Sequence, residues 1–301
     1  MTMTKAKSIG VIRTSAGTAL LLLLLGLPPR ALAADDRRLD AIKGTLQSSS
    51  LSNAEQTDVR ARADAAIRGG VPAEDVEIIV SRAVQRGAGA EAINRFIDTS
   101  LSAKKEGVPI APVLDRIEQG LSKGVPFERI AAASQQLAEK LAIAQPIVDT
   151  LIRGGVKQGR SSEREAAIAA TARAIEKSIP VEDLKGMGAA VRDRKGTLPL
   201  FTSAANTAAY LAGSGMSVKT SSHLVRNAVE KGYSERDLDG MIKQMTEEMR
   251  HGSRPEDAAT RMERGNMQGG RGMDQNMGNG RGPEAGSGGM GGMGGMGGRR
   301  K

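Results

Sequence analysis

The chain contains no cysteine and no tryptophan, and it has only five aromatic residues. The absence of cysteine excludes disulfides, thiol nucleophiles and a lipid-modified cysteine after a leader segment. Sites for carbohydrates and single-stranded nucleic acids usually stack ligand rings on aromatic side chains, so the shortage argues against both classes. The interior of a folded domain must instead be built from Ala, Val, Ile and Leu, which favours closely packed helices.

Residues that carry catalysis are also scarce. Only two histidines occur: His223 lies beside an apolar stripe, and His251 precedes Gly252 at the expected end of a helix. We interpret both as structural, because neither has an acidic partner at a ligand-like spacing. No serine lies in a G-x-S-x-G turn, and no phosphate-binding loop is present. The sequence therefore predicts no catalytic residue and no cofactor-binding residue.

Three Glu-Asp pairs need a separate interpretation because paired carboxylates can also act as acid and base. Each pair falls in the first turn of an expected helix, where negative charge opposes the positive end of the helix dipole. We therefore predict that they favour helix starts rather than catalysis. The pairs are Glu74/Asp75, Glu182/Asp183 and Glu256/Asp257.

The formal charge of +9 is spread unevenly along the chain. Most of it belongs to the two ends, which leaves residues 34–264 at only about +2. That is an ordinary solvated surface rather than the basic footprint of a nucleic-acid-binding protein. We predict no nucleic-acid partner.

A period of 37 residues organises the central part of the chain. Residues 70–86 and 87–106 form two helix-length segments, and a similar pair begins at Gly107. In the first segment Val76, Ile79, Val80, Ala83 and Val84 recur at the spacing of one helix face. Neither segment can bury its stripe alone, so the unit predicts a helical hairpin stacked against neighbouring hairpins.

The same period predicts most of the helix boundaries. Glycine punctuates the segments, since it readily adopts the left-handed conformation that ends a helix. We predict breaks near Gly70, Gly87, Gly107, Gly124, Gly215, Gly232 and Gly252. We count about eleven helices between Asp35 and Gly265, and no alternating apolar pattern long enough for a strand.

Local signals place the remaining helix starts. Asn53 is expected to cap the second helix, Pro146 to begin a helix one period after Pro109, and Ser162 to form a capping box with Glu165. The period slips between about residues 155 and 215. The predicted fold is therefore all-α, a tandem array of antiparallel hairpins that forms either a solenoid or a closed bundle.

Residues 1–33 have the features of an export signal. Basic residues precede an apolar run over residues 16–27, and Ala31-Leu32-Ala33 offers small residues for cleavage after Ala33. The run is shorter than the ~20 residues that span a bilayer as a helix. We predict a periplasmic or secreted protein with no stable membrane span after cleavage.

Residues 265–301 differ from the rest: 16 of these 37 residues are glycine and six are methionine. With no large aliphatic or aromatic side chain, the segment is expected to be a flexible tail. Met290, Met293 and Met296 are separated by Gly-Gly, and thioethers are soft ligands that suit Cu(I). A weak Cu(I) site on these three methionines is the one chemical hypothesis that the sequence supports.

The chain resembles two known groups of proteins, one only in its helical architecture and the other only in the composition of its C-terminal segment. The hairpin period is similar in length to tetratricopeptide repeats, but their Trp, Gly, Tyr and Ala signature is missing. The Gly-Gly-Met repeats resemble the C-terminal tails of bacterial chaperonins over about ten residues, with nothing similar elsewhere. The sequence therefore favours a non-enzymatic binding or scaffolding module of the bacterial cell envelope, with an envelope protein as its partner. A periplasmic Cu(I)-handling protein is the alternative, followed by an enzyme of unknown class.

Overall fold

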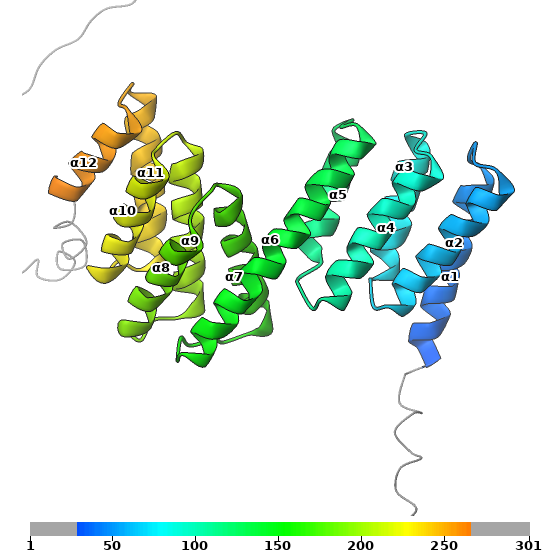
Figure 1. Ribbon diagram of the computed structural model, residues 1–301, viewed down its shortest axis with the longest axis horizontal. Helices are drawn as coiled ribbons and strands as arrows, with labels where there is room; N and C mark the ends of the chain where they lie inside the picture. The colour runs from blue at the N-terminus through cyan, green and yellow to red at the C-terminus, as the bar shows by residue number, and fades with distance from the viewer. Residues whose placement is uncertain (1–28, 266–301) are drawn as a thin grey trace, which may run out of the picture.

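A computed structural model describes residues 29–265, which form twelve α-helices and, within that range, no strand (Figure 1). The predicted all-α class is thus confirmed. Short turns join the helices, so that consecutive helices run antiparallel. The helices are α1 Pro29–Gln47, α2 Asn53–Arg68, α3 Ala73–Gln85, α4 Ala90–Lys105, α5 Ala111–Ser122, α6 Phe127–Arg153, α7 Ser161–Glu176, α8 Val181–Asp193, α9 Leu198–Gly213, α10 Val218–Glu230, α11 Glu235–Arg250 and α12 Pro255–Gly265.

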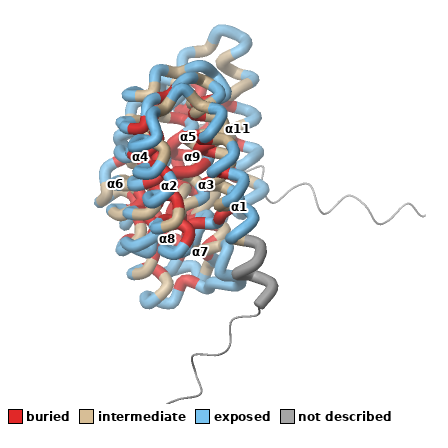
Figure 2. Tube along the Cα trace, turned by 90° about the vertical axis from the view of Figure 1, so that its right-hand side faces the viewer, coloured by how far each residue is buried: buried red, intermediate tan, exposed pale blue. Residues whose placement is uncertain are grey.

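The helices form an open, elongated stack of two layers rather than a closed bundle. Figure 2 looks along this stack: even-numbered helices form one layer, odd-numbered helices the other, and buried residues lie between them. Within the layers, α2, α4 and α6 pack in succession, as do α6, α8, α10 and α12. The odd layer contains the successions α1, α3, α5 and α7, α9, α11.

The apolar stripe predicted for α3 is the side that it buries. Val76, Ile79, Val80 and Ala83 are at most 2% exposed. Each helix of the stack contributes a similar stripe to one continuous core. Burial of a Val, Leu or Ile side chain stabilises a fold by about 1.5–3 kcal/mol, so these stripes hold the layers together.

The predicted glycine breaks are confirmed, and one geometry accounts for them. All seven glycines have positive φ, from 71° at Gly124 to 106° at Gly232. In each turn the next residue donates its N–H back into the helix, as Ala88 does to the Ala83 carbonyl at 2.9 Å. This is the Schellman ending, which satisfies carbonyl groups that the helix leaves unpaired.

The same turn geometry explains why the sequence period slips in the second half. Ser178 and Lys195 have φ of 65° and 55°, and they occupy the positions that glycine holds in other turns. Ile179 donates to the Ala174 carbonyl at 3.0 Å, and Gly196 donates to the Val191 carbonyl at 2.9 Å. The hairpins therefore continue through residues 155–215 although the glycine signal is interrupted.

Helix α6 corrects the prediction at Pro146. This proline does not begin a helix; it lies inside a 27-residue helix. Its missing N–H removes one backbone hydrogen bond, and its carbonyl accepts a hydrogen bond from the Thr150 hydroxyl at 2.7 Å. One helix thus joins the second helix of one hairpin to the first helix of the next.

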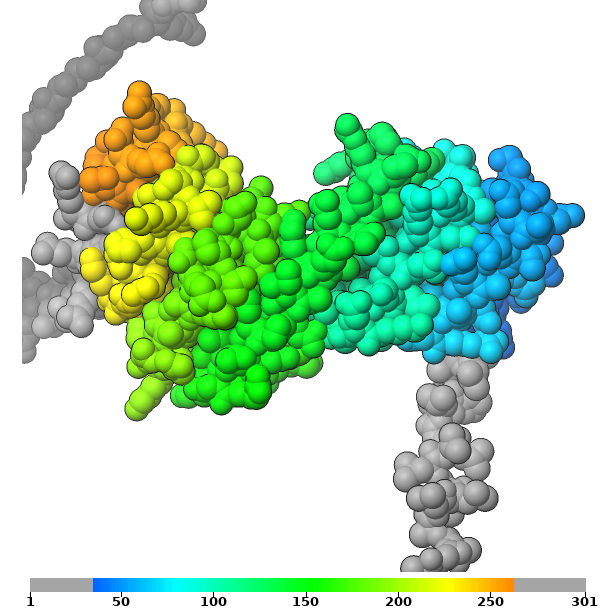
Figure 3. Space-filling model, in the orientation of Figure 1, coloured from blue at the N-terminus to red at the C-terminus, as the bar shows by residue number. Residues whose placement is uncertain are grey.

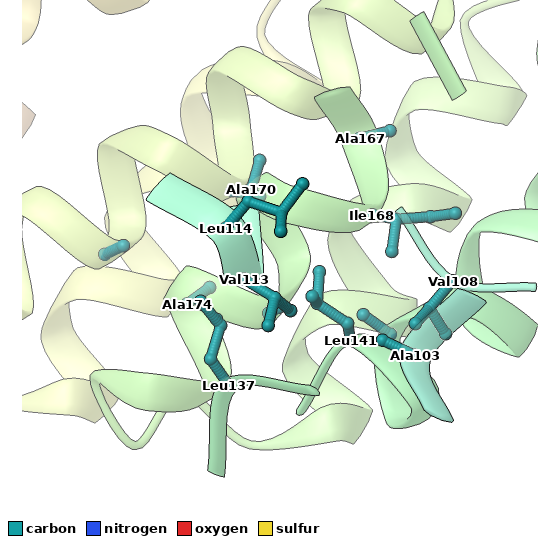
Figure 4. Close-up of a cluster of buried hydrophobic side chains, with 14 of the residues drawn as sticks. Ala103, Val108, Val113, Leu114, Leu137, Leu141, Ala167, Ile168, Ala170 and Ala174 are labelled. Atoms are coloured by element: carbon teal, nitrogen blue, oxygen red, sulfur yellow. The ribbon is translucent and has the colours of Figure 1, made fainter. Parts of the chain in front are cut away.

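This fusion exchanges the roles of the two layers. Helix α6 packs against α4 as the second helix of its hairpin, and its residues 143–151 lie beside α8. Before α6, the first helix of each hairpin therefore lies in the odd layer. After α6, the first helix of each hairpin lies in the even layer. Figure 4 shows side chains of α5, α6 and α7 meeting at this joint: Val113, Leu114, Leu137, Leu141, Ala170 and Ala174.

An ion pair also crosses the joint. Arg116 of α5 donates from both guanidinium ends to Glu176 of α7, at 3.1 and 3.3 Å. Burial is the largest single influence on Glu176 and works against the charged carboxylate. The hydrogen bonds and charge of Arg116, together with the charges of Lys140 and Lys177, outweigh it and lower the pKa of Glu176. The pair fixes the end of α7 against α5.

Two predicted helix starts are wrong in detail. The α2 cap is Ser52, not Asn53, and it forms a capping box with Glu55. Helix α7 begins at Ser161 without a side-chain cap, and Glu163 accepts from the Gly159 N–H at 2.8 Å. Both errors are shifts of one or two residues, which a pattern of residue types does not resolve.

At the N-terminal end, α1 begins at Pro29, before the cleavage position predicted after Ala33. The apolar run of the predicted signal lies outside the described residues. Among the helices of the described part, none is both long and apolar enough to cross a membrane.

Candidate binding groove

A groove lies on the even layer between the second half of α6 and α8. It has a volume of about 450 Å³. Figure 3 shows this face of the molecule, with α6, α8, α10 and α12 following one another across it. The lining residues are Ile143, Pro146, Ile147, Thr150, Leu151, Val181, Lys185, Ala189 and Arg192.

The groove is apolar because it exposes residues that a stack would normally cover. Ile143 is 48% exposed, and only Tyr210 joins it as an exposed large hydrophobic residue in the described part of the chain. Ile147 and Val181 continue the apolar lining from α6 and α8. Singly exposed apolar residues are common, but an exposed isoleucine inside a concave apolar lining favours a binding role.

Small residues of α8 create the hollow. The helix carries Gly186, Gly188, Ala189 and Ala190 in its centre. A Cβ on Gly188 would lie only 2.4 Å from the side chain of Leu151, so the Leu151 side chain occupies the space that a larger residue at position 188 would need. Ala189 faces outward into the groove and is too short to fill it.

A second hollow of about 470 Å³ continues the groove between α8 and α10. The two hollows share Ala189, so together they run across three helices. The second one is more polar. It is lined by Gly186, Ala189, Ala190, Asp193, Arg194, Arg226 and Glu230.

The charged groups around both hollows are already paired. Lys185 contacts Glu182 at 2.7 Å, and Arg192 contacts Asp193 at 3.0 Å. Arg226 binds Glu230 at 2.8 Å, and this hydrogen bond is the main cause of the raised pKa of Arg226. These pairs surround an apolar floor with neutralised polar groups.

Arg194 is held by two backbone carbonyl groups instead of by a carboxylate. It donates to the carbonyls of Val229 and Tyr233 at 2.6 and 3.0 Å. It thereby ties the end of α8 to the turn after α10. The arrangement suits a ligand with apolar side chains and few charges.

The histidines considered in the sequence do not come together at this groove. His223 lies exposed on α10 with Nδ1 3.2 Å from Nδ2 of Asn227, and His251 contacts Glu247 at 3.3 Å. Neither lines either hollow. Within the described residues, no group of three or more His, Cys, Asp or Glu side chains could hold a metal ion.

The Glu-Asp pairs lie in the first turns of α3, α8 and α12, as predicted. Their surroundings differ. Burial raises the pKa of Asp75, and the nearby carboxylates of Glu118, Glu74 and Asp115 add to the effect. This acidic cluster belongs to α3 and α5 on the odd layer, away from the groove.

Met290, Met293 and Met296 lie outside the described residues. The Cu(I) hypothesis therefore stays a prediction.

The sequence did not predict the groove itself. The signal that could have located it is Gly186-Met187-Gly188-Ala189-Ala190, a segment in the middle of a helix in which four of the five residues are small. Comparison with known protein families, curated proteins and solved structures finds no match for this chain.

Proposed function

We propose that this protein is an exported, non-enzymatic helical-repeat module that binds or scaffolds polypeptides in the bacterial cell envelope. The observation that carries the proposal is the apolar groove between α6 and α8, with Ile143 half exposed at its edge. Stacked hairpins commonly present extended surfaces of this kind to their partners.

The shape of the groove favours a polypeptide segment over a small molecule. Small-molecule pockets bury most of their ligand's surface, whereas this site is a surface trough that continues past Ala189 to α10. An extended segment can follow such a trough and place apolar side chains in successive hollows. Because the rim charges are already paired, a weakly charged segment would be favoured over a highly charged one.

Export rests on the sequence of residues 1–33 alone. N-terminal sequencing of the protein from the envelope fraction should begin at Ala34. An intact Met1 in the cytoplasmic fraction would contradict both the location and the proposed class of partner.

Site-specific crosslinking tests the groove. A photoreactive amino acid at Lys185, in cells that make the protein naturally, should give a discrete adduct with one envelope polypeptide. The same group at Lys243, exposed on α11 of the odd layer, should not. Ala189→Leu should remove the adduct because its side chain would obstruct the point where the two hollows meet, while Ala169→Leu on the half-exposed side of α7 should preserve it.

The four results together decide the proposal. Equal adducts from Lys185 and Lys243, or an adduct insensitive to Ala189→Leu, would show that the groove is not the binding surface. Leucine and alanine have similar helix propensities, so neither Ala189→Leu nor Ala169→Leu is expected to disturb the helix that carries it.

A further inference from the structure

The groove lies close to the point where the described chain ends. Helix α12 finishes at Gly265 and packs on α10, which packs on α8 in the same even layer. Residues 266–301 continue from that point. The groove is therefore two to three helix positions away, on the same layer as the start of this segment.

We infer that the segment around Met290, Met293 and Met296 occupies the groove of its own chain. Methionine is the only large apolar residue type in 266–301. Its unbranched thioether adapts to irregular apolar hollows. The intervening glycines add no charge, so the paired ions at the rim of the groove would keep their partners.

The length of the connecting chain fits this occupant. From Gly265 to Met290 there are 25 residues, and a Gly-rich chain of that length has a root-mean-square span of about 25–30 Å. Packed helices are spaced by about 8–10 Å, so two to three steps from α12 to the groove cover roughly 16–30 Å. An intramolecular site is occupied most effectively when the span of the linker matches the distance.

The spacing of the methionines fits as well. In an extended chain with three residues per turn, successive methionines lie about 9 Å apart on one edge. That distance is close to the spacing of neighbouring helices. Two consecutive methionines can then enter the hollows on either side of α8, which meet at Ala189.

Occupancy by the tail is independent of any partner. A regulatory role, in which the tail competes with an envelope polypeptide, rests on the proposed function. The experiment below uses purified full-length protein alone, so its outcome does not depend on whether such a partner exists.

The absence of native cysteine permits a clean test. We would combine Gly292→Cys with Lys185→Cys at the groove, or with Lys243→Cys on α11 as the control, and measure intramolecular disulfide formation under mild oxidation. Helix α11 packs directly against α12, so the tether alone favours the control pair. We expect the groove pair to react about tenfold faster, because docking raises the local concentration of the tail thiol.

Replacement of Met290, Met293 and Met296 by serine should lower the groove rate to the control rate or below it. Ala189→Leu should do the same, while circular dichroism verifies that each variant stays helical. Equal rates for the two pairs, or a groove rate that is insensitive to the serine substitutions, would overturn the inference.

Discussion

Helices α3 and α8 begin with nearly the same sequence block but present different surfaces. Val71-Pro72-Ala73-Glu74-Asp75-Val76 and Ile179-Pro180-Val181-Glu182-Asp183-Leu184 begin the two helices. Each helix ends with an arginine that binds carbonyls of the following hairpin: Arg86 reaches Val125 at 3.1 Å, and Arg194 reaches Val229 at 2.6 Å. The frame of the repeat is therefore the same in both halves of the molecule.

The central residues of the two helices differ. Where α3 has Ile78 and Val80, α8 has Gly186 and Gly188. Because Gly188 has no side chain, α8 packs tightly on Leu151 of the long helix α6. Because Gly186 has none either, part of the outer face of α8 is hollow. Glycine at both positions thus distinguishes α8 from α3, and of the two Gly186 lines the hollow between α8 and α10.

The largest expected effect comes from replacing Gly188 of α8 by valine, the residue at the equivalent position of α3. Gly188→Val places a Cβ 2.4 Å from Leu151, in a core that cannot expand freely. Overpacking of this kind costs about 1–3 kcal/mol, so we expect a loss of about 2 kcal/mol in urea unfolding. At Gly186 the nearest atoms are 3.7 Å away on Arg226, so there is room for a side chain.

Gly186→Ile is therefore the matched control. It should be neutral or stabilising by about 0.5 kcal/mol, since isoleucine has the higher helix propensity. Similar losses at both positions would show that the two glycines do not have separate roles.

The second contrast concerns the turns that end these helices. Gly87 ends α3 with φ of 74°, and Lys195 ends α8 with φ of 55°. A left-handed conformation costs a residue with a Cβ about 1–2 kcal/mol, and glycine avoids that cost but loses more entropy on folding. Lys195→Gly should therefore stabilise the protein by about 0.5 kcal/mol.

The reverse exchange, Gly87→Lys, should destabilise by about 1 kcal/mol. A Cβ at Gly87 would meet no atom within 4 Å, so the effect reports backbone conformation alone. Thermal unfolding of the two variants and the parent measures both values. Opposite signs from those stated would mean that tertiary contacts, not turn conformation, set the stability of these turns.

These positions also show what the sequence could and could not predict. Glycine spacing and apolar stripes predicted the hairpins because both reflect local backbone and burial requirements. The interior position of Pro146 was not predictable, because neighbouring helices decide whether a helix continues through a proline. The two hollows were missed because the small residues of α8 acquire their roles only beside residues of α6 and α10, such as Leu151 and Arg226, which are distant in sequence.

The smallest effect separates the acidic starts of the two helices. Asp75 faces carboxylates of α3 and α5, whereas Asp183 lies near the guanidinium of Arg226. Because burial and these neighbouring carboxylates raise the folded-state pKa of Asp75, its ionised form costs stability above that pKa. The cost disappears as the pH falls below the unfolded value of about 3.9.

Asp75→Asn should therefore raise the free energy of unfolding at pH 7 relative to Asp183→Asn, by less than about 0.5 kcal/mol because water screens both sites. Both variants lose the same interaction with a helix N-terminus, so their difference isolates the neighbouring charges. The advantage of Asp75→Asn should shrink steadily as the pH is lowered from 7 towards about 4. A difference that is absent at pH 7, or that grows as the pH falls, would show that the carboxylates around Asp75 do not repel one another.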